Sequence, residues 1–390
     1  MNPSATGWIK KLLKEVSGDE TFLNNTLEHF YQELKQCGFI YGSNVDVVSN
    51  AIPKKDLTDE ELCKVNLILA FFYFYKRNPS EEKFIDTVIN FYSAITVSKT
   101  SIFQSLLIKK KSAALLEDLI EKRVHIDDNV FTKNFNYFIT NALLFVDVLA
   151  YQKYLDTNTV SDKYLQDIET SIETIVIEVF ESKLQKTKYD DSLTKLFKLS
   201  RRYHSNGPLD YGEAIATLKT SLEKRYIIDI ACMASWTDNV IDKSENLFLA
   251  QFCEHLDLEI VVLRQSIVDI DLFYNSNKSK VAALGSKNFV KSFYDNSSKM
   301  VMKLISRNSK RLLQELKESK ELMVLLTKST TRELTAAEHK KVQEQLMDIF
   351  KSIPSLAIFM LPGGALLLPL FIKFIPKLLP SAFDENRIDD

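Results

Sequence analysis

Three acidic residues in a short interval could bind a hard cation. Asp238, Asp242 and Glu245 fall within eight residues of one another, and carboxylate oxygens are the ligands that Ca²⁺ and Mg²⁺ accept. The Asp242-x-x-Glu245 spacing also suits a helix capping box, in which each side chain binds the other residue's backbone amide. It does not match an EF-hand, because Val240 and Lys243 stand where a ligand and the turn glycine belong. We predict capping, with a bound divalent cation as the alternative.

No motif for catalysis stands beside these carboxylates. The sequence has no dinucleotide-binding glycine pattern, P-loop, nucleophile elbow or His-Glu-x-x-His. The five histidines are scattered, and neighbours such as Cys253 and His255 point apart on a helix. We predict that the protein is not an enzyme and, the alternative cation aside, has no cofactor.

A second set of candidates is basic. Residues 278–320 contain eleven Lys or Arg against three acidic residues, a net charge of +8 in a chain of net charge −2. Six of them follow a four-residue spacing that places them along one helix face: Lys287, Lys291, Lys299, Lys303, Arg307 and Arg311. A solvated face, an anionic lipid surface, RNA phosphates and a protein partner are the interpretations. The weak overall charge predicts no DNA binding.

The third candidate is an uncharged run from Ile353 to Ile372. Twenty uncharged and mostly apolar residues just suit the hydrocarbon core of a bilayer, and the lysines that follow could reach the headgroups. Regular prolines would kink a helix and free its carbonyls, so a re-entrant, interfacial or buried hairpin is the alternative to a span. The residues of this membrane segment are Pro354, Pro362, Gly363, Gly364, Pro369, Lys373, Pro376 and Pro380.

Helices must position all these residues. There are only nine glycines and nine prolines, and no glycine lies between Gly42 and Gly207, which argues against folds that need frequent turns. Capping boxes at Thr58 and Thr335, and the Asn78-Pro79-Ser80-Glu81 string, predict helix starts. Residues 65–75 predict a buried core helix, and residues 8–14 the start of an amphipathic surface helix. The four cysteines are expected to be reduced and mostly buried. The fold class is therefore all-α.

Residues 211–259 resemble tellurite-resistance TerB-like domains. The string from Ala231 to Glu245 carries the resemblance, with a helix that ends in an Asp-containing turn before a Glu opens the next helix. The usual Asp-Gly pair is Asp238-Asn239 here, and Asn tolerates the left-handed conformation that Gly would supply. The resemblance implies a helical unit over this interval.

The C-terminal residues resemble the membrane segment of LETM-type proteins, a family named for its leucine zipper, EF-hand and transmembrane segment. The pattern runs through Pro362, Pro369, Lys373, Pro376 and the Pro380-Ser381-x-Phe383 end. The resemblance implies a membrane protein with a role in cation transport or ribosome association. Ala365 stands where the family commonly carries an acidic residue, which counts against cation transport. We expect the family's large downstream domain, its ribosome-binding-like part, to be missing, which would weaken ribosome association. Overall the chain is similar to bacterial LETM-related biofilm-associated proteins.

These observations predict four regions: a helical N-terminal region (1–205), a TerB-like unit (206–275), a basic helical connector (276–334) and a LETM-type segment with a short tail (335–390). With no signal-peptide run at the N-terminus, we expect the bulk of the chain in the cytoplasm and a C-terminal membrane anchor. The expected function is a membrane-anchored scaffold or regulator, linked by resemblance to biofilm formation. Cation homeostasis and ribosome association are the alternatives. The expected partners are membrane lipid, an unidentified protein and, by family resemblance, the ribosome.

Overall fold

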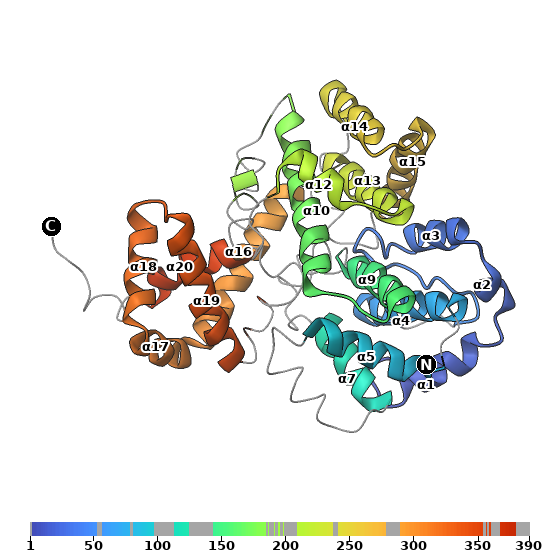
Figure 1. The fold of residues 1–390 in the computed structure, drawn as a ribbon, viewed down its shortest axis with the longest axis horizontal. Helices are drawn as coiled ribbons and strands as arrows, with labels where there is room; N and C mark the ends of the chain where they lie inside the picture. Colours follow the sequence, from blue (N-terminus) through green and yellow to red (C-terminus); the bar gives the residue numbers. More distant parts are fainter. Residues whose placement is uncertain are drawn as a thin grey trace.

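The computed structural model describes residues 2–52, 57–78, 81–96, 113–124, 143–184, 209–236, 241–277, 289–353 and 367–379, with single positions within 186–198 and at 356 and 359. Across these residues every regular element is a helix, which confirms the all-α prediction. The helices form two groups (Figure 1): a body, α1 to α15, and a C-terminal lobe, with α16 between the body and the other lobe helices.

The body is built from short and medium helices. Its elements are α1 (Trp8–Val16), α2 (Glu20–Asn24), α3 (Leu27–Gln36), α4 (Asp59–Arg77), α5 (Phe84–Thr96), α7 (Ala113–Val124), α9 (Leu144–Thr157), α10 (Asp162–Ser182), α12 (Tyr211–Thr217), α13 (Ser221–Ser235), α14 (Lys243–His255) and α15 (Ile260–Asn277). Helix α4 packs on α5, α7 and α9, and α10 packs on α9, α12, α13 and α14. These two helices therefore organise the body.

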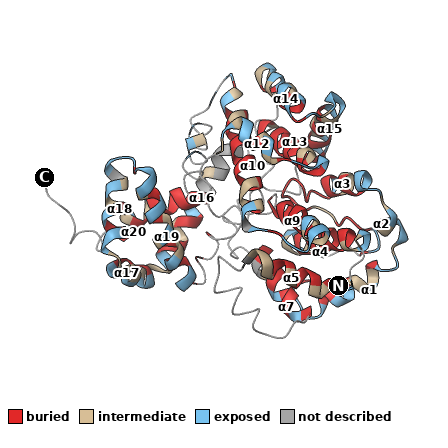
Figure 2. Ribbon diagram, in the orientation of Figure 1, coloured by how far each residue is buried: buried red, intermediate tan, exposed pale blue. Residues whose placement is uncertain are grey.

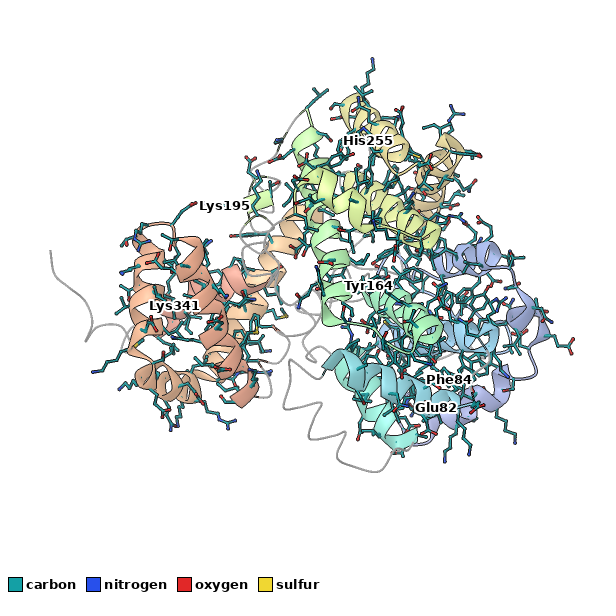
Figure 3. The ribbon with its side chains drawn as sticks, in the orientation of Figure 1. Glu82, Phe84, Tyr164, Lys195, His255 and Lys341 are labelled. Atoms are coloured by element: carbon teal, nitrogen blue, oxygen red, sulfur yellow. The ribbon has the colours of Figure 1, made fainter. Side chains whose placement is uncertain are left out.

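The buried helices are those that the apolar patterns predict. Residues 62–74 of α4 are all buried, so the core helix expected over residues 65–75 is confirmed. Ile168, Ile172, Ile175 and Val179 of α10 lie on one buried face, as their spacing predicts. Side chains fill the space between the helices of the body (Figure 3), in which Phe84 of α5 and Tyr164 of α10 are labelled. Figure 2 shows the same buried interior in both groups of helices.

Helix ends follow the capping signals in most places. Thr58 and Thr335 form the expected capping boxes with Glu61 and Glu338. The start predicted at Pro79 is wrong, because Glu81 is not helical and α5 begins at Phe84. Asn78 instead ends α4 as its C-cap, since a residue before proline avoids the helical conformation.

Helix α1 confirms the amphipathic segment and shows how it is held. Trp8, Ile9 and Leu12 are buried, and α1 packs against α7. The Glu117 carboxylate of α7 accepts hydrogen bonds from the amides of Gly7 (2.9 Å) and Ile9 (3.1 Å). A carboxylate at a helix N-terminus binds free amides and opposes the positive end of the helix dipole. Glu117 therefore fixes the N-terminal helix to the body.

One buried lysine joins three helices that are distant in sequence. The Lys35 ammonium of α3 lies 2.9 Å from Asp229 of α13 and 2.6 Å from Asp269 of α15. Tyr31 donates a second bond to Asp229 at 2.9 Å. Burial alone would lower the pKa of Lys35, but the two carboxylates raise it above its ordinary value. These contacts join the predicted TerB-like unit directly to the N-terminal helices.

All four cysteines are buried free thiols, as predicted. Burial raises the pKa of Cys37 to about 12, so this thiol stays protonated at neutral pH.

The C-terminal lobe consists of α16 (Phe289–Arg307), α17 (Ser309–Glu318), α18 (Lys320–Thr331), α19 (Ala336–Ser352) and α20 (Leu368–Leu378). Helix α20 packs on α16 and α18, and α18 packs on α17 and α19. The predicted connector (276–334) and the predicted membrane segment thus contribute helices to one bundle, seen at the left of Figure 1.

Candidate functional site

The acidic pair of the predicted cation site caps α14. Asp242 accepts hydrogen bonds from the Ser244 and Glu245 amides at 2.8 Å, and Glu245 accepts one from the Asp242 amide at 2.9 Å. The second Asp242 oxygen accepts from the Leu184 amide, and Glu245 lies 3.7 Å from the Lys183 ammonium. The bond from the Glu245 amide is the main cause that lowers the pKa of Asp242 to about 2. Three of the four carboxylate oxygens thus accept hydrogen bonds, and the fourth, Oε1 of Glu245, faces the Lys183 ammonium.

This geometry confirms the predicted capping box. Asp238 lies outside the described residues. Within the described ranges, no group of three or more His, Cys, Asp or Glu side chains is arranged to hold a metal ion.

The predicted basic stripe is divided between two helices. Lys299, Lys303 and Arg307 lie on α16, and Arg311 lies on α17. Asn308 separates the helices with a non-helical backbone (φ −103°, ψ 11°). The four-residue spacing therefore does not continue along one straight face. Lys291 lies within α16, and Lys287 is outside the described residues.

Helix α17 carries a further group of exposed cations, beside the exposed carboxylate of Glu318. Leu312 and Leu316 are buried, while Lys310, Arg311 and Lys317 are exposed on the outer side, and Lys320 follows at the next helix start. These four cations, which we call the α17 basic face, form no ion pair with the residues that the structure describes. Residues 289–379 contain fifteen Lys or Arg and eight acidic residues, a net charge of +7. The four-residue spacing did not include Lys310 and Lys317 in the predicted stripe. The apolar pair Leu312 and Leu316 was the signal for them, because a helix that buries these two leucines exposes both lysines.

The apolar segment does not form one helix over residues 353–372. Helix α19 ends at Ser352, and α20 begins at Leu368 and has eleven residues. At 1.5 Å per residue it is about 16 Å long, about half the hydrocarbon thickness of a bilayer. Across the described ranges, no helix combines the length and apolarity needed to cross a membrane. The predicted transmembrane anchor is therefore not confirmed.

The described part of this segment is packed inside the lobe. Leu368, Leu370 and Ile375 of α20 are buried. Phe371 lies in a ring cluster with Phe350 and Phe359, with centroid distances of 4.7–5.1 Å. The buried-hairpin alternative suits these residues, because their apolar faces meet helices of the same lobe.

The predicted residues of this segment take different places. Pro369 lies in the first turn of α20, where proline costs no hydrogen bond, and Pro376 lies inside the helix near its end. The Lys373 ammonium contacts the Tyr294 hydroxyl of α16 at 3.0 Å. Pro354, Pro362, Gly363, Gly364 and Pro380 lie outside the described residues, as does Ala365.

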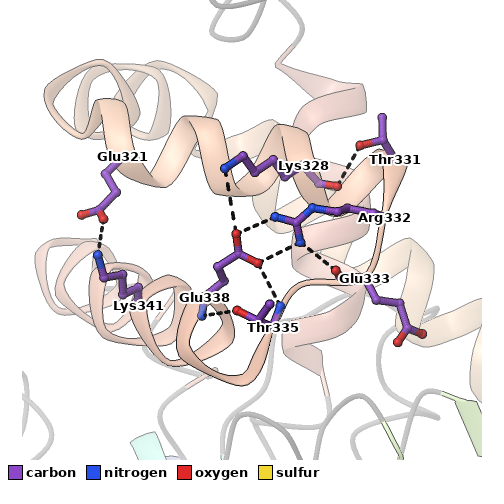
Figure 4. A network of polar contacts seen from close by, with 8 residues as sticks. All are labelled: Glu321, Lys328, Thr331, Arg332, Glu333, Thr335, Glu338 and Lys341. Atoms are coloured by element: carbon purple, nitrogen blue, oxygen red, sulfur yellow. Dashed lines mark hydrogen bonds and ion pairs between the residues drawn. The ribbon is translucent and has the colours of Figure 1, made fainter.

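A polar network fixes the α18–α19 hairpin at the start of this segment (Figure 4). Glu338 closes the capping box with Thr335 and also binds both terminal nitrogens of Arg332 at 2.6 and 2.8 Å. Glu321 and Lys341 pair across the same two helices at 2.6 Å. The bond to Arg332 is the main cause that lowers the pKa of Glu338 to about 2. Glu338 thus remains charged at any physiological pH.

The comparisons with known proteins fall on this part of the chain. The family model described as "LETM1-like, RBD" matches residues 334–390. A fruit-fly protein (Drosophila melanogaster) named "Mitochondrial proton/calcium exchanger protein" is 46% identical over 53 residues, which are 14% of this chain and 5% of that protein. The alignment thus spans about one twentieth of that relative's length. No solved structure matches.

The LETM-type resemblance of the C-terminal segment is therefore confirmed, and this segment is LETM1-like. Its described residues form α19 and α20 and pack within the lobe that carries the α17 basic face. The TerB-like assignment, the four region boundaries and the similarity to bacterial proteins stay predictions.

Proposed function

We propose, from the LETM-type character of residues 334–390, that the chain is a non-enzymatic scaffold of a LETM-related system and that its C-terminal lobe binds an anionic membrane surface. The observation that carries this proposal is the α17 basic face, whose four exposed cations have no ion-pair partner in the described chain.

The position of this face supports a lipid partner. The Ser352 hydroxyl at the end of α19 binds Glu315 of α17 at 2.8 Å, so the α17 helix lies beside the point where α19 ends. The uncharged run of the sequence begins at the next residue, Ile353. A basic surface beside the beginning of an apolar segment is the arrangement that anionic headgroups favour.

The test is flotation of the full-length protein with lipid vesicles. We expect binding to vesicles that contain phosphatidylserine and much weaker binding to neutral phosphatidylcholine vesicles. Each basic residue near an anionic surface contributes about 1 kcal/mol, so reversal of three charges should weaken binding on the order of 100-fold or more. The variant is Lys310→Glu/Arg311→Glu/Lys317→Glu, in which each residue is exposed.

The control reverses the same number of charges elsewhere. Lys10, Lys11 and Lys14 are exposed on α1, far from the lobe in Figure 1. The Lys10→Glu/Lys11→Glu/Lys14→Glu variant should bind vesicles nearly as wild type does. Equal losses in the two variants would mean that only net charge matters and would refute the proposal. Salt-sensitive binding to RNA with no vesicle binding would also refute it.

Carbonate extraction of the full chain then separates two modes of membrane attachment. Release by carbonate would indicate surface binding through the α17 basic face. Retention would indicate that the apolar segment leaves the lobe and enters the bilayer, as the predicted anchor requires. The full chain is needed because removal of residues after Ser352 would delete α20 from the lobe core.

A role in cation homeostasis is the second candidate, favoured by the name of the fly relative that is similar over 53 residues. The scaffold would then act on a proton or calcium transport system at that membrane. Reconstitution into vesicles with proton- and calcium-sensitive dyes tests whether the chain itself moves ions. A folded, membrane-bound protein that gives no flux would exclude transport by the chain alone. Neither comparison confirms biofilm formation or ribosome association, so both stay predictions.

A further inference from the structure

Exposed apolar side chains of the described residues concentrate at one edge of the body. Five of the eight large hydrophobic residues that are exposed there lie on α14 and α15: Leu247, Ile260, Val261, Val268 and Leu272, with 46–61% of their surface accessible. Both helices lie at the upper right margin of the body in Figure 1. Single exposed apolar residues are ordinary, but a cluster on neighbouring helices indicates an interaction surface.

The exposed face of α15 has the spacing of a helix-pairing seam. Val261, Gln265, Val268, Leu272 and Asn275 follow one another at intervals of four, three, four and three, and all five are exposed. We call these residues the α15 seam. The opposite face, with Leu263, Ile270 and Phe273, is buried, and α15 packs on α3, α13 and α14. Alternating spacings of three and four are those of knobs-into-holes pairing between two helices.

Two charged residues beside the seam favour a second copy of this chain as the partner. Arg264 and Asp271 are seven residues apart and therefore lie along the same edge of the helix. Arg264 is exposed and has no ion-pair partner among the described residues, while Asp271 accepts a bond from Asn275 at 2.8 Å. When two identical helices pair antiparallel about a twofold axis, residues on the same edge meet across the axis.

A twofold axis between Ile267 and Val268 suits both the spacing of the α15 seam and the positions of the two charged residues. Arg264 of each copy then lies at the level of Asp271 of the other, which gives two opposite-charge contacts. At the same register Leu272 enters the space between Val261 and Gln265 of the other copy, and Val268 lies beside the axis. The seam is thus complementary to itself in shape and charge when the helices are antiparallel.

We propose that the chain forms a twofold-symmetric dimer through the antiparallel pairing of the α15 seam with that of a second copy. This interface lies on the body, whereas the proposed membrane contact lies on the C-terminal lobe, so the two surfaces act independently. One helix pair forms a small interface, and we expect a dissociation constant in the roughly micromolar range.

Sedimentation equilibrium of the full-length protein over a concentration series is the first test. We expect a reversible dimer, and Arg264→Asp should weaken it by about 10-fold or more because like charges then face each other twice. Asp271→Arg alone should weaken it similarly. The double variant Arg264→Asp/Asp271→Arg restores the opposite charges and should recover most of the affinity. A chain that stays monomeric to about 100 µM, or a double variant no better than the single ones, would overturn the proposal.

A cysteine cross-link tests the position of the axis. All four native cysteines are buried, so a new surface thiol can be read selectively. Val268→Cys, beside the axis, should form a disulfide-linked dimer under mild oxidation. Val324→Cys is the matched control, because Val324 is 41% exposed on α18 and lies outside the seam. Equal cross-linking of the two variants, or none at position 268, would contradict the proposed interface.

Discussion

The buried pair of Arg123 and Asp147 should be far more sensitive to the loss of one partner than to the loss of both. The Arg123 guanidinium of α7 donates two hydrogen bonds to the Asp147 carboxylate of α9, at 2.6 and 2.9 Å. Tyr92 of α5 donates a third at 3.1 Å. Asp147 is fully buried and Arg123 is 2% exposed, so no solvent can replace a lost partner.

The magnitude follows from this burial. In Asp147→Leu, the buried guanidinium keeps its charge but loses the carboxylate that it binds, which typically costs about 3–5 kcal/mol. The Tyr92 hydroxyl also loses its acceptor, which adds about 1 kcal/mol. Arg123→Met leaves the carboxylate unpaired at a similar cost. In the double variant both charges are gone, and apolar side chains of similar volume usually restore stability to within about 1–2 kcal/mol of wild type.

Urea unfolding followed by circular dichroism measures these differences, with thermal unfolding as a second readout. The two single variants and the double variant form a double-mutant cycle, for which we expect a coupling energy of several kcal/mol. The reasoning is refuted if Asp147→Leu costs less than about 1 kcal/mol, or if the two single losses simply add in the double variant.

Three further changes test separate parts of the fold. Gly38→Ala should lower the free energy of unfolding in urea by at least about 2 kcal/mol. The reason is that Gly38 has φ +84° and an added Cβ would lie 1.9 Å from the Ser43 carbonyl oxygen. Gly18→Ala is the control and should be nearly neutral, because an added Cβ there meets open space. Glu338→Gln should have a lower melting temperature than the wild type at pH 6. This difference in melting temperature should vanish as the pH falls from about 4.5 towards 2, because the folded-state pKa of Glu338 is about 2 and the wild-type carboxylate is then protonated as well. A pH-independent difference would contradict that cause. Glu117→Ala should speed hydrogen exchange at the first amides of α1, and unchanged exchange would mean that Glu117 does not cap this helix.

Local patterns predicted the helices well. The capping boxes at Thr58, Asp242 and Thr335 lie within three residues of sequence, so the contacts that form them are already specified there. The apolar run of α4 is longer than any strand needs and could only be a buried helix. The same local character explains why the capping of α14 by Asp242 and Glu245 could be predicted.

The sequence was least informative where distant contacts decide the structure. Length and hydropathy suited residues 353–372 to a bilayer, but they suit a bundle core equally well, and the partners of α20 lie on α16 and α18. The basic stripe was predicted along one continuous helix. The four-residue spacing contains no signal for the end of α16 at Asn308. The buried pairs of Lys35 and Arg123 could not be predicted, because each depends on a residue of another helix.

The Lys35 cluster has a consequence for how the chain is made. Asp229 and Asp269 follow Lys35 by 194 and 234 residues, so they leave the ribosome roughly 10–50 s later at about 5–20 residues per second. Until then the lysine of α3 has no counter-ion and cannot be buried at low cost. We therefore expect α3 to dock only after synthesis of α15, so a chain stalled before residue 269 should expose the first helices to proteases and chaperones.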